Sequence, residues 1–87
     1  MYDYQDYKPE IFKEENLETF LKIRDGIAAT ITIAGCITMG KAINFGNGDP
    51  WLRMAMVDRL VEAGEIIEVE RPKDVDVAGQ HRIFIKY

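Results

Sequence analysis

Apolar residues recur at helical spacing between residues 50 and 63, and this pattern predicts a long amphipathic helix. Its apolar face is formed by Leu52, Met56, Val57, Leu60, Val61 and Ala63. Asp49 can cap the first turn, Pro50 suits the first helical position, and Gly64 suits a left-handed end after the last turn. Residues 65 to 71 are partly alternating and rich in β-branched side chains, which is typical of a strand. A capped helix leading straight into a strand therefore organises this half of the chain.

A first long helix is predicted from the acidic segment at residues 14 to 16 as far as Thr32, with its end at Gly35. Acidic residues stabilise the positive end of the helix dipole, and an apolar face follows them. Its members are Leu17, Phe20, Leu21, Ile23 and Ile27. Residues 29 to 33 are β-branched enough to suit a strand. Ile31 nevertheless continues the helical spacing, so we extend the helix through them.

A short extended segment at residues 36 to 38 and a short helix at residues 39 to 45 are expected between the two long helices. The turn-forming run at residues 46 to 48 ends the short helix directly before the next cap, which makes a helix, tight turn, helix unit. Residues 80 to 87 predict a closing strand. We expect it to pair with the preceding strand as an antiparallel hairpin around a loop at residues 72 to 79.

The start of the chain shows no clear periodicity. We interpret residues 1 to 10 as an N-terminal arm and residues 11 to 87 as the folded domain. The arm carries Tyr2, Tyr4 and Tyr7. Their spacing leaves open a strand, an aromatic clip packed on the body, or a solvated tail.

This order of elements resembles the winged helix-turn-helix family. The segment from Arg59 to Ile67, which reads RLVEAGEII, is similar to that family's passage from the third helix into the wing. The resemblance covers about residues 15 to 87 and implies an α+β fold of three helices with a short strand and a C-terminal β-hairpin. It also implies that the helix at 50 to 63 takes the recognition position, which lies in the major groove of DNA in most members, and that residues 72 to 79 form the wing tip.

The outward face of that helix departs from the pattern of a groove reader. With the apolar face turned inward, we expect this outward face to show Trp51, Met54 or Ala55, Asp58 and Glu62, flanked by Arg53 and Arg59. Base edges are read mainly by Arg, Lys, Asn, Gln, Ser or Thr. The wing adds the cations Arg71, Lys73 and Arg82, together with the acids Asp74 and Asp76. An aromatic and a methionine beside acids suit a protein surface better than a DNA groove.

Each candidate residue also has a purely structural interpretation. Trp51 can close the core against the preceding turn instead of forming an exposed anchor. The acids Glu68 and Glu70 alternate along the second strand and suit a solvated face. Cys36 lies among apolar neighbours, which favours a buried structural thiol, and as the single cysteine it can form no intramolecular disulfide.

Composition argues against catalysis. The chain has no serine, and its only histidine, His81, lies in a charged segment away from any predicted nucleophile. We expect no catalytic residue, metal site or cofactor, and we infer no small-molecule substrate. Neither a leader nor a long uncharged apolar run is present, so we expect a cytoplasmic protein that does not enter the membrane.

Two functional hypotheses remain. In the first, the chain is a small binding or regulatory module that contacts a protein partner or itself through the N-terminal arm or the outward face of the helix at 50 to 63. In the second, it is a DNA-binding regulator that uses this helix and the wing at 71 to 82. The formal net charge of −4 works against sequence-independent attraction to phosphates. The second hypothesis therefore needs its basic residues on one face without intervening carboxylates; these residues are Lys41, Arg53, Arg59, Arg71, Lys73 and Arg82.

Overall fold

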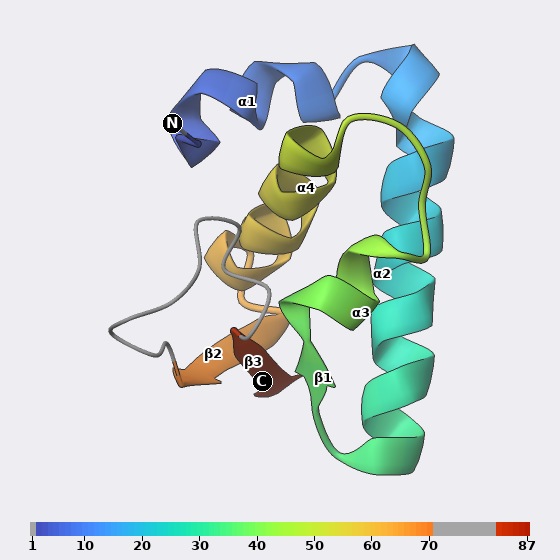
Figure 1. The fold of residues 1–87 in the computed structure, drawn as a ribbon, viewed down its shortest axis with the longest axis vertical. Coiled ribbons are helices and arrows are strands. Elements are labelled where there is room, and N and C mark those ends of the chain that lie inside the picture. The colour runs from blue at the N-terminus through green and yellow to red at the C-terminus, as the bar shows by residue number, and fades with distance from the viewer. Residues whose placement is uncertain (1, 71–81) are drawn as a thin grey trace.

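The computed structural model describes residues 2–70 and 82–87, which form an α+β fold with helices packed on a small antiparallel sheet (Figure 1). The elements are α1 (Tyr4–Ile11), α2 (Glu14–Ala34), β1 (Ile37–Thr38), α3 (Met39–Ile43), α4 (Pro50–Glu62), β2 (Ile66–Glu70) and β3 (Ile83–Lys86). In Figure 1, α4 lies between α1 at the top and the sheet at the bottom, and α2 runs along one side. None of the helices in the described part is both long and apolar enough to cross a membrane.

The helix α2 confirms the predicted first long helix, including its extension through the β-branched stretch. Ile23, Ile27 and Ile31 are all buried, so one apolar stripe runs along the helix. Gly35 ends it with a φ of 85°, and the Gly35 amide donates to the carbonyl of Ile31 at 2.7 Å. The ring of Phe45 packs against Gly26 inside this helix. A side chain at this position would not fit, because its Cβ would come within 2.3 Å of the ring.

The helix α4 confirms the predicted caps. The Asp49 carboxylate accepts a hydrogen bond from the amide of Trp51 at 2.9 Å, and Gly64 follows the helix with a φ of 80°. The turn before α4 is held by Arg53. Its guanidinium donates to the carbonyl oxygens of Ile43, Gly46 and Gly48 at 2.8, 3.3 and 3.2 Å. Arg53 therefore links the end of α3 to the start of α4.

The sheet has the strand order β1-β3-β2, with both pairings antiparallel. The β2–β3 pairing confirms the predicted hairpin, and Ile67 lies opposite Ile85 in the register. Phe84 of β3 is fully buried beneath the helices. The predicted wing tip at residues 72 to 79, and with it Lys73, lies outside the described residues, as does Arg71.

The N-terminal segment forms a helix that the sequence interpretation did not include. Residues 4–11 make α1, whose N-cap Asp3 accepts from the amide of Gln5 at 3.0 Å. Ile11 is 1% exposed and belongs to the core. The tyrosines at positions 2, 4 and 7 are partly buried and pack against this core. The segment is therefore neither a strand nor a solvated tail. Cys36 also differs from expectation, because it is exposed just after α2 ends.

We predict that Ile11→Ala lowers the free energy of unfolding by about 2–5 kcal/mol, because it leaves a cavity where α1 enters the core. The neighbouring Phe12 is 59% exposed, so Phe12→Ala should cost less than about 1 kcal/mol. Urea denaturation followed by circular dichroism measures both. Equal losses in the two variants would show that α1 is not anchored through Ile11.

Candidate functional site

The candidate site lies on the face of α4 that the sequence analysis expected to point outward. In the structure α1 packs along this face. The Tyr2 ring stacks on Trp51 with a centroid distance of 5.7 Å and an interplanar angle of 19°. The Tyr7 ring also stacks on Tyr2, with a centroid distance of 5.9 Å. Trp51 is half-buried and packs on the core, in agreement with its structural interpretation.

Polar contacts continue along the same face. The Tyr2 hydroxyl donates to Asp58 Oδ2 at 2.5 Å, and the Tyr4 hydroxyl donates to Glu62 Oε1 at 3.3 Å. Lys8 Nζ lies 2.8 Å from the same Glu62 oxygen. The side chains of α4 that would meet a partner are therefore engaged by the chain's own N-terminal segment.

Met54 and Ala55 correct the predicted orientation of α4. One of them was expected on the outward face, yet Met54 is 3% exposed and Ala55 is fully buried. Both lie within one helical turn of Trp51 and Asp58, on the face that α1 covers. The prediction went wrong because it placed solvent where α1 packs.

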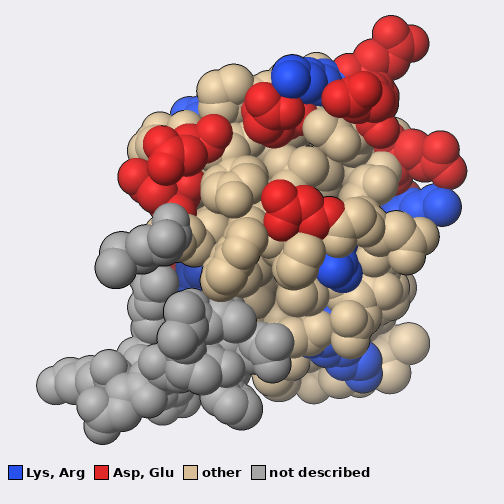
Figure 2. Space-filling view, turned by 45° about the horizontal axis from the view of Figure 1, so that its top comes forward, with Lys and Arg blue, Asp and Glu red and all other residues tan. Residues whose placement is uncertain are grey.

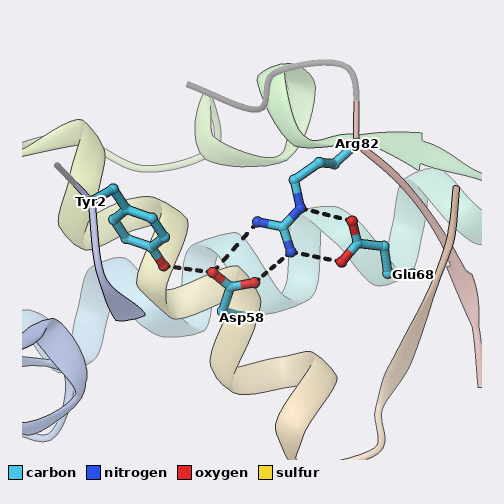
Figure 3. Close-up of polar contacts among 4 residues, drawn as sticks. All are labelled: Tyr2, Asp58, Glu68 and Arg82. Atoms are coloured by element: carbon cyan, nitrogen blue, oxygen red, sulfur yellow. Dashed lines mark hydrogen bonds and ion pairs between the residues drawn. The ribbon is translucent and has the colours of Figure 1, made fainter. Parts of the chain in front are cut away.

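A buried guanidinium lies at the centre of the polar contacts (Figure 3). Arg82 lies just before β3 and is 3% exposed. Its Nε and Nη2 atoms donate to the two carboxylate oxygens of Glu68 at 2.8 and 2.7 Å, and Nη2 also donates to Asp58 Oδ1 at 2.7 Å. The group also lies 5.4 Å from the Phe84 ring centroid. This one cation thus links the hairpin to α4, and Asp58 also accepts the hydrogen bond from the Tyr2 hydroxyl.

The orientation of Glu68 is a second correction. The alternation of Glu68 and Glu70 favoured a solvated acidic face, but Glu68 points towards Arg82 and its side chain is only 19% exposed. A group of apolar side chains lies on the opposite face of the hairpin. We call it the outer sheet face, and it consists of Ile67, Val69, Ile83, Ile85 and Tyr87.

The pKa shifts follow these contacts. Burial opposes the charged form of Arg82, but the hydrogen bonds to Glu68 and Asp58 outweigh it, so the pKa of the guanidinium lies above its ordinary value. Burial and the hydrogen bond to Asp58 raise the pKa of Tyr2 above 10.0. Burial and the Glu62 carboxylate raise the pKa of Tyr4 to about 12. The hydrogen bond from Lys8 lowers the pKa of Glu62.

The candidate DNA-contacting cations do not form one free basic face within the described ranges. Arg82 is buried between two carboxylates, and Arg53 is bound to backbone carbonyls. Arg59 lies 3.2 Å from Glu62 and over the Phe12 ring. Lys41 is exposed on α3. Figure 2 shows basic side chains scattered among acidic and uncharged ones on the face turned forward.

The structure brings together only part of the predicted site. Trp51 and Asp58 meet through Tyr2, which the prediction did not include, and Arg82 joins them from the hairpin. An open cavity of about 410 Å³ lies beside this cluster and is lined mainly by tyrosines and acids. In residues 2–70 and 82–87, no group of three or more His, Cys, Asp or Glu is arranged to hold a metal ion. His81, Asp74 and Asp76 lie outside these residues.

Comparisons with protein-family models, with curated proteins and with solved structures find no match for this chain.

We predict that Arg82→Met lowers the free energy of unfolding by about 3 kcal/mol or more, because it leaves two partly buried carboxylates without their cation. Arg59→Met is the matched control: its ion pair with Glu62 is more exposed, so the loss should stay below about 1 kcal/mol. Urea denaturation measures both values. Similar losses would contradict a central role for the buried guanidinium.

The raised tyrosine pKa values predict a loss of stability in alkali. Below pH 10 the phenols are neutral in both states, so their contribution is fully present. As the pH rises from 10 towards 12 and above, the unfolded chain ionises first and stability falls. Denaturation across this range should show the fall, and Tyr2→Phe should reduce it. An identical pH dependence in Tyr2→Phe would contradict the assignment.

Proposed function

We propose that this chain is a small non-enzymatic domain of winged-helix topology that binds protein. Two features support the topology: the element order from α2 through β3 follows that pattern, and the strand order is β1-β3-β2. Helix α1 is an addition at the front of this arrangement. The proposal of a non-catalytic role rests on a sequence without serine and on acids that are engaged in structural contacts.

The observation that carries the proposal is the outer sheet face. Ile67 is 39% exposed, Val69 is 50% exposed and Tyr87 is 79% exposed, while Ile83 and Ile85 are half-buried between them. The helices pack on the opposite face, which carries Phe84. Contiguous apolar side chains that remain open to solvent mark protein interaction surfaces. The interaction surface of this proposal is therefore the sheet, not the outward face of α4 or the N-terminal segment.

DNA binding is the alternative, and the winged-helix topology favours it. Two observations weigh against it in this conformation. Helix α1 covers the face of α4 that would enter a groove. Three arginines proposed to contact DNA are already engaged: Arg82 and Arg59 by carboxylates, and Arg53 by backbone carbonyls. Groove reading by α4 would require α1 to leave this face.

Salt separates the two hypotheses. Two copies of a chain with net charge −4 repel each other, so self-association through an apolar face should strengthen as salt screens that repulsion. Binding to DNA should instead weaken as salt rises, because it depends on cations that displace counterions.

We therefore predict that the mass measured by light scattering rises above 10.0 kDa with concentration, and rises further with added salt. The double variant Ile67→Thr/Val69→Thr keeps β-branched side chains and the net charge, yet should remain monomeric. Leu17→Gln removes an exposed apolar side chain from α2 and serves as the control that still associates. A constant monomeric mass, together with salt-sensitive amide shifts of α4 on addition of duplex DNA, would favour the alternative.

A further inference from the structure

A second cavity lies on the other side of the molecule from α1, between α2 and the open end of the β2–β3 hairpin. It measures about 220 Å³. In Figure 1 the lower half of α2 runs beside this end of the sheet. The cavity belongs to neither the α1–α4 contact nor the outer sheet face, so it is independent of the proposed function.

The floor of this cavity is aliphatic. Four buried side chains form it: Ile27, Ile31, Leu60 and Ile66. Ala28 and Thr32, one helical turn apart on α2, line its exposed side. Because Ala28 is small, it leaves the floor accessible between the helix and the sheet. A ligand that enters here would meet hydrocarbon below and water at the rim.

The rim carries charge, and one cation there has no partner among the described residues. Lys86 lies on the same face of β3 as the buried Phe84, so it is directed towards the cavity. No ion pair or hydrogen bond of its ammonium group occurs within the described part of the chain. Arg24 also lines the rim but lies 3.1 Å from Asp25, and Glu65 adds one carboxylate. Among the described residues, Lys86 is therefore the rim cation whose ammonium has no partner, and it lies on the cavity-facing side of β3.

We infer that this cavity binds a small monocarboxylate with a short unbranched aliphatic chain. The chain lies on the aliphatic floor and the carboxylate meets Lys86. The size of the ligand follows from the volume, because pockets for drug-sized ligands measure about 300–1,000 Å³ and this cavity is smaller. The charge of the ligand follows from Lys86, the rim cation that has no partner in the described residues and that lies on the cavity-facing side of β3.

The test is a titration of the folded protein with hexanoate, followed by methyl NMR of Ile27, Ile31 and Ile66. We expect saturable shifts of the methyl signals of these three residues. Acetate, which lacks the chain, should cause none at the same concentrations. Each methylene added between acetate and hexanoate should tighten binding by about fourfold, because it buries one more apolar group.

Two variants test the two halves of the site. Lys86→Gln should weaken hexanoate binding by about two- to fivefold, to the affinity of hexan-1-ol, since an exposed ion pair contributes that much. Lys22→Gln makes the same change of charge on α2, where the lysine pairs with Glu18, and should leave binding unchanged. Ala28→Met should fill the cavity and abolish binding while the circular dichroism spectrum stays that of the folded protein.

Several outcomes would overturn the inference. They are shifts that spread over the surface without saturating, hexan-1-ol binding as tightly as hexanoate to the unmodified protein, and equal weakening by the two lysine variants. None of them bears on self-association through the outer sheet face, which is measured by mass in the absence of these ligands.

Discussion

The buried guanidinium of Arg82 is the interaction on which the arrangement of this domain depends. An ion placed in a protein interior costs several kcal/mol unless its partners are close and well oriented. Arg82 has two such partners, Glu68 on β2 and Asp58 on α4. Because the three groups come from different elements, the contact fixes the position of the hairpin against α4. The Tyr2 hydroxyl adds a further donor to Asp58 and connects this cluster to the segment before α1.

The same contacts decide what remains available for function. Helix α4 has buried residues on most of its circumference, and these include Met54 and Ala55 on the face that α1 covers. The proposed interaction surface is therefore the outer sheet face, where apolar side chains remain exposed. Within the described residues, the arginines that could have supported DNA binding are engaged elsewhere: Arg53 holds the turn before α4, Arg82 holds the hairpin, and Arg59 pairs near the end of α4. Carboxylates of the chain itself thus pair with Arg82 and Arg59, while the hydrogen-bonding groups of Arg53 are occupied by backbone carbonyls.

Much of the fold could be predicted from the sequence where local signals agreed. The caps of α4 and the glycine after it gave its limits, and the spacing of Ile23, Ile27 and Ile31 outweighed the β-branched character of α2. The hairpin followed from two β-rich segments separated by a polar loop. These features depend on residues close together in the chain.

Features that depend on distant residues were missed. Tyr4, Tyr7 and Ile11 have helical spacing, but Pro9 interrupts the pattern, and what stabilises α1 is its contact with α4 about fifty residues away. The side chain of Glu68 points inward because it pairs with Arg82, fourteen residues later. No local pattern around Glu68 reveals this pairing. For α4, the run from Met54 to Val57 is apolar without interruption, a signal of burial on more than one face that could have been used.

The central claim is that the chain's own N-terminal helix covers one face of α4. Hydrogen exchange of the α1 backbone amides tests this claim most directly. The opening free energies measured at the amides of Lys8, Glu10 and Ile11 should be nearly as large as those of the α4 amides, because α1 is part of the same packed unit. If these amides instead exchange like those of an unstructured peptide while the α4 amides stay protected, α1 does not cover α4, and that helix is free to meet a partner.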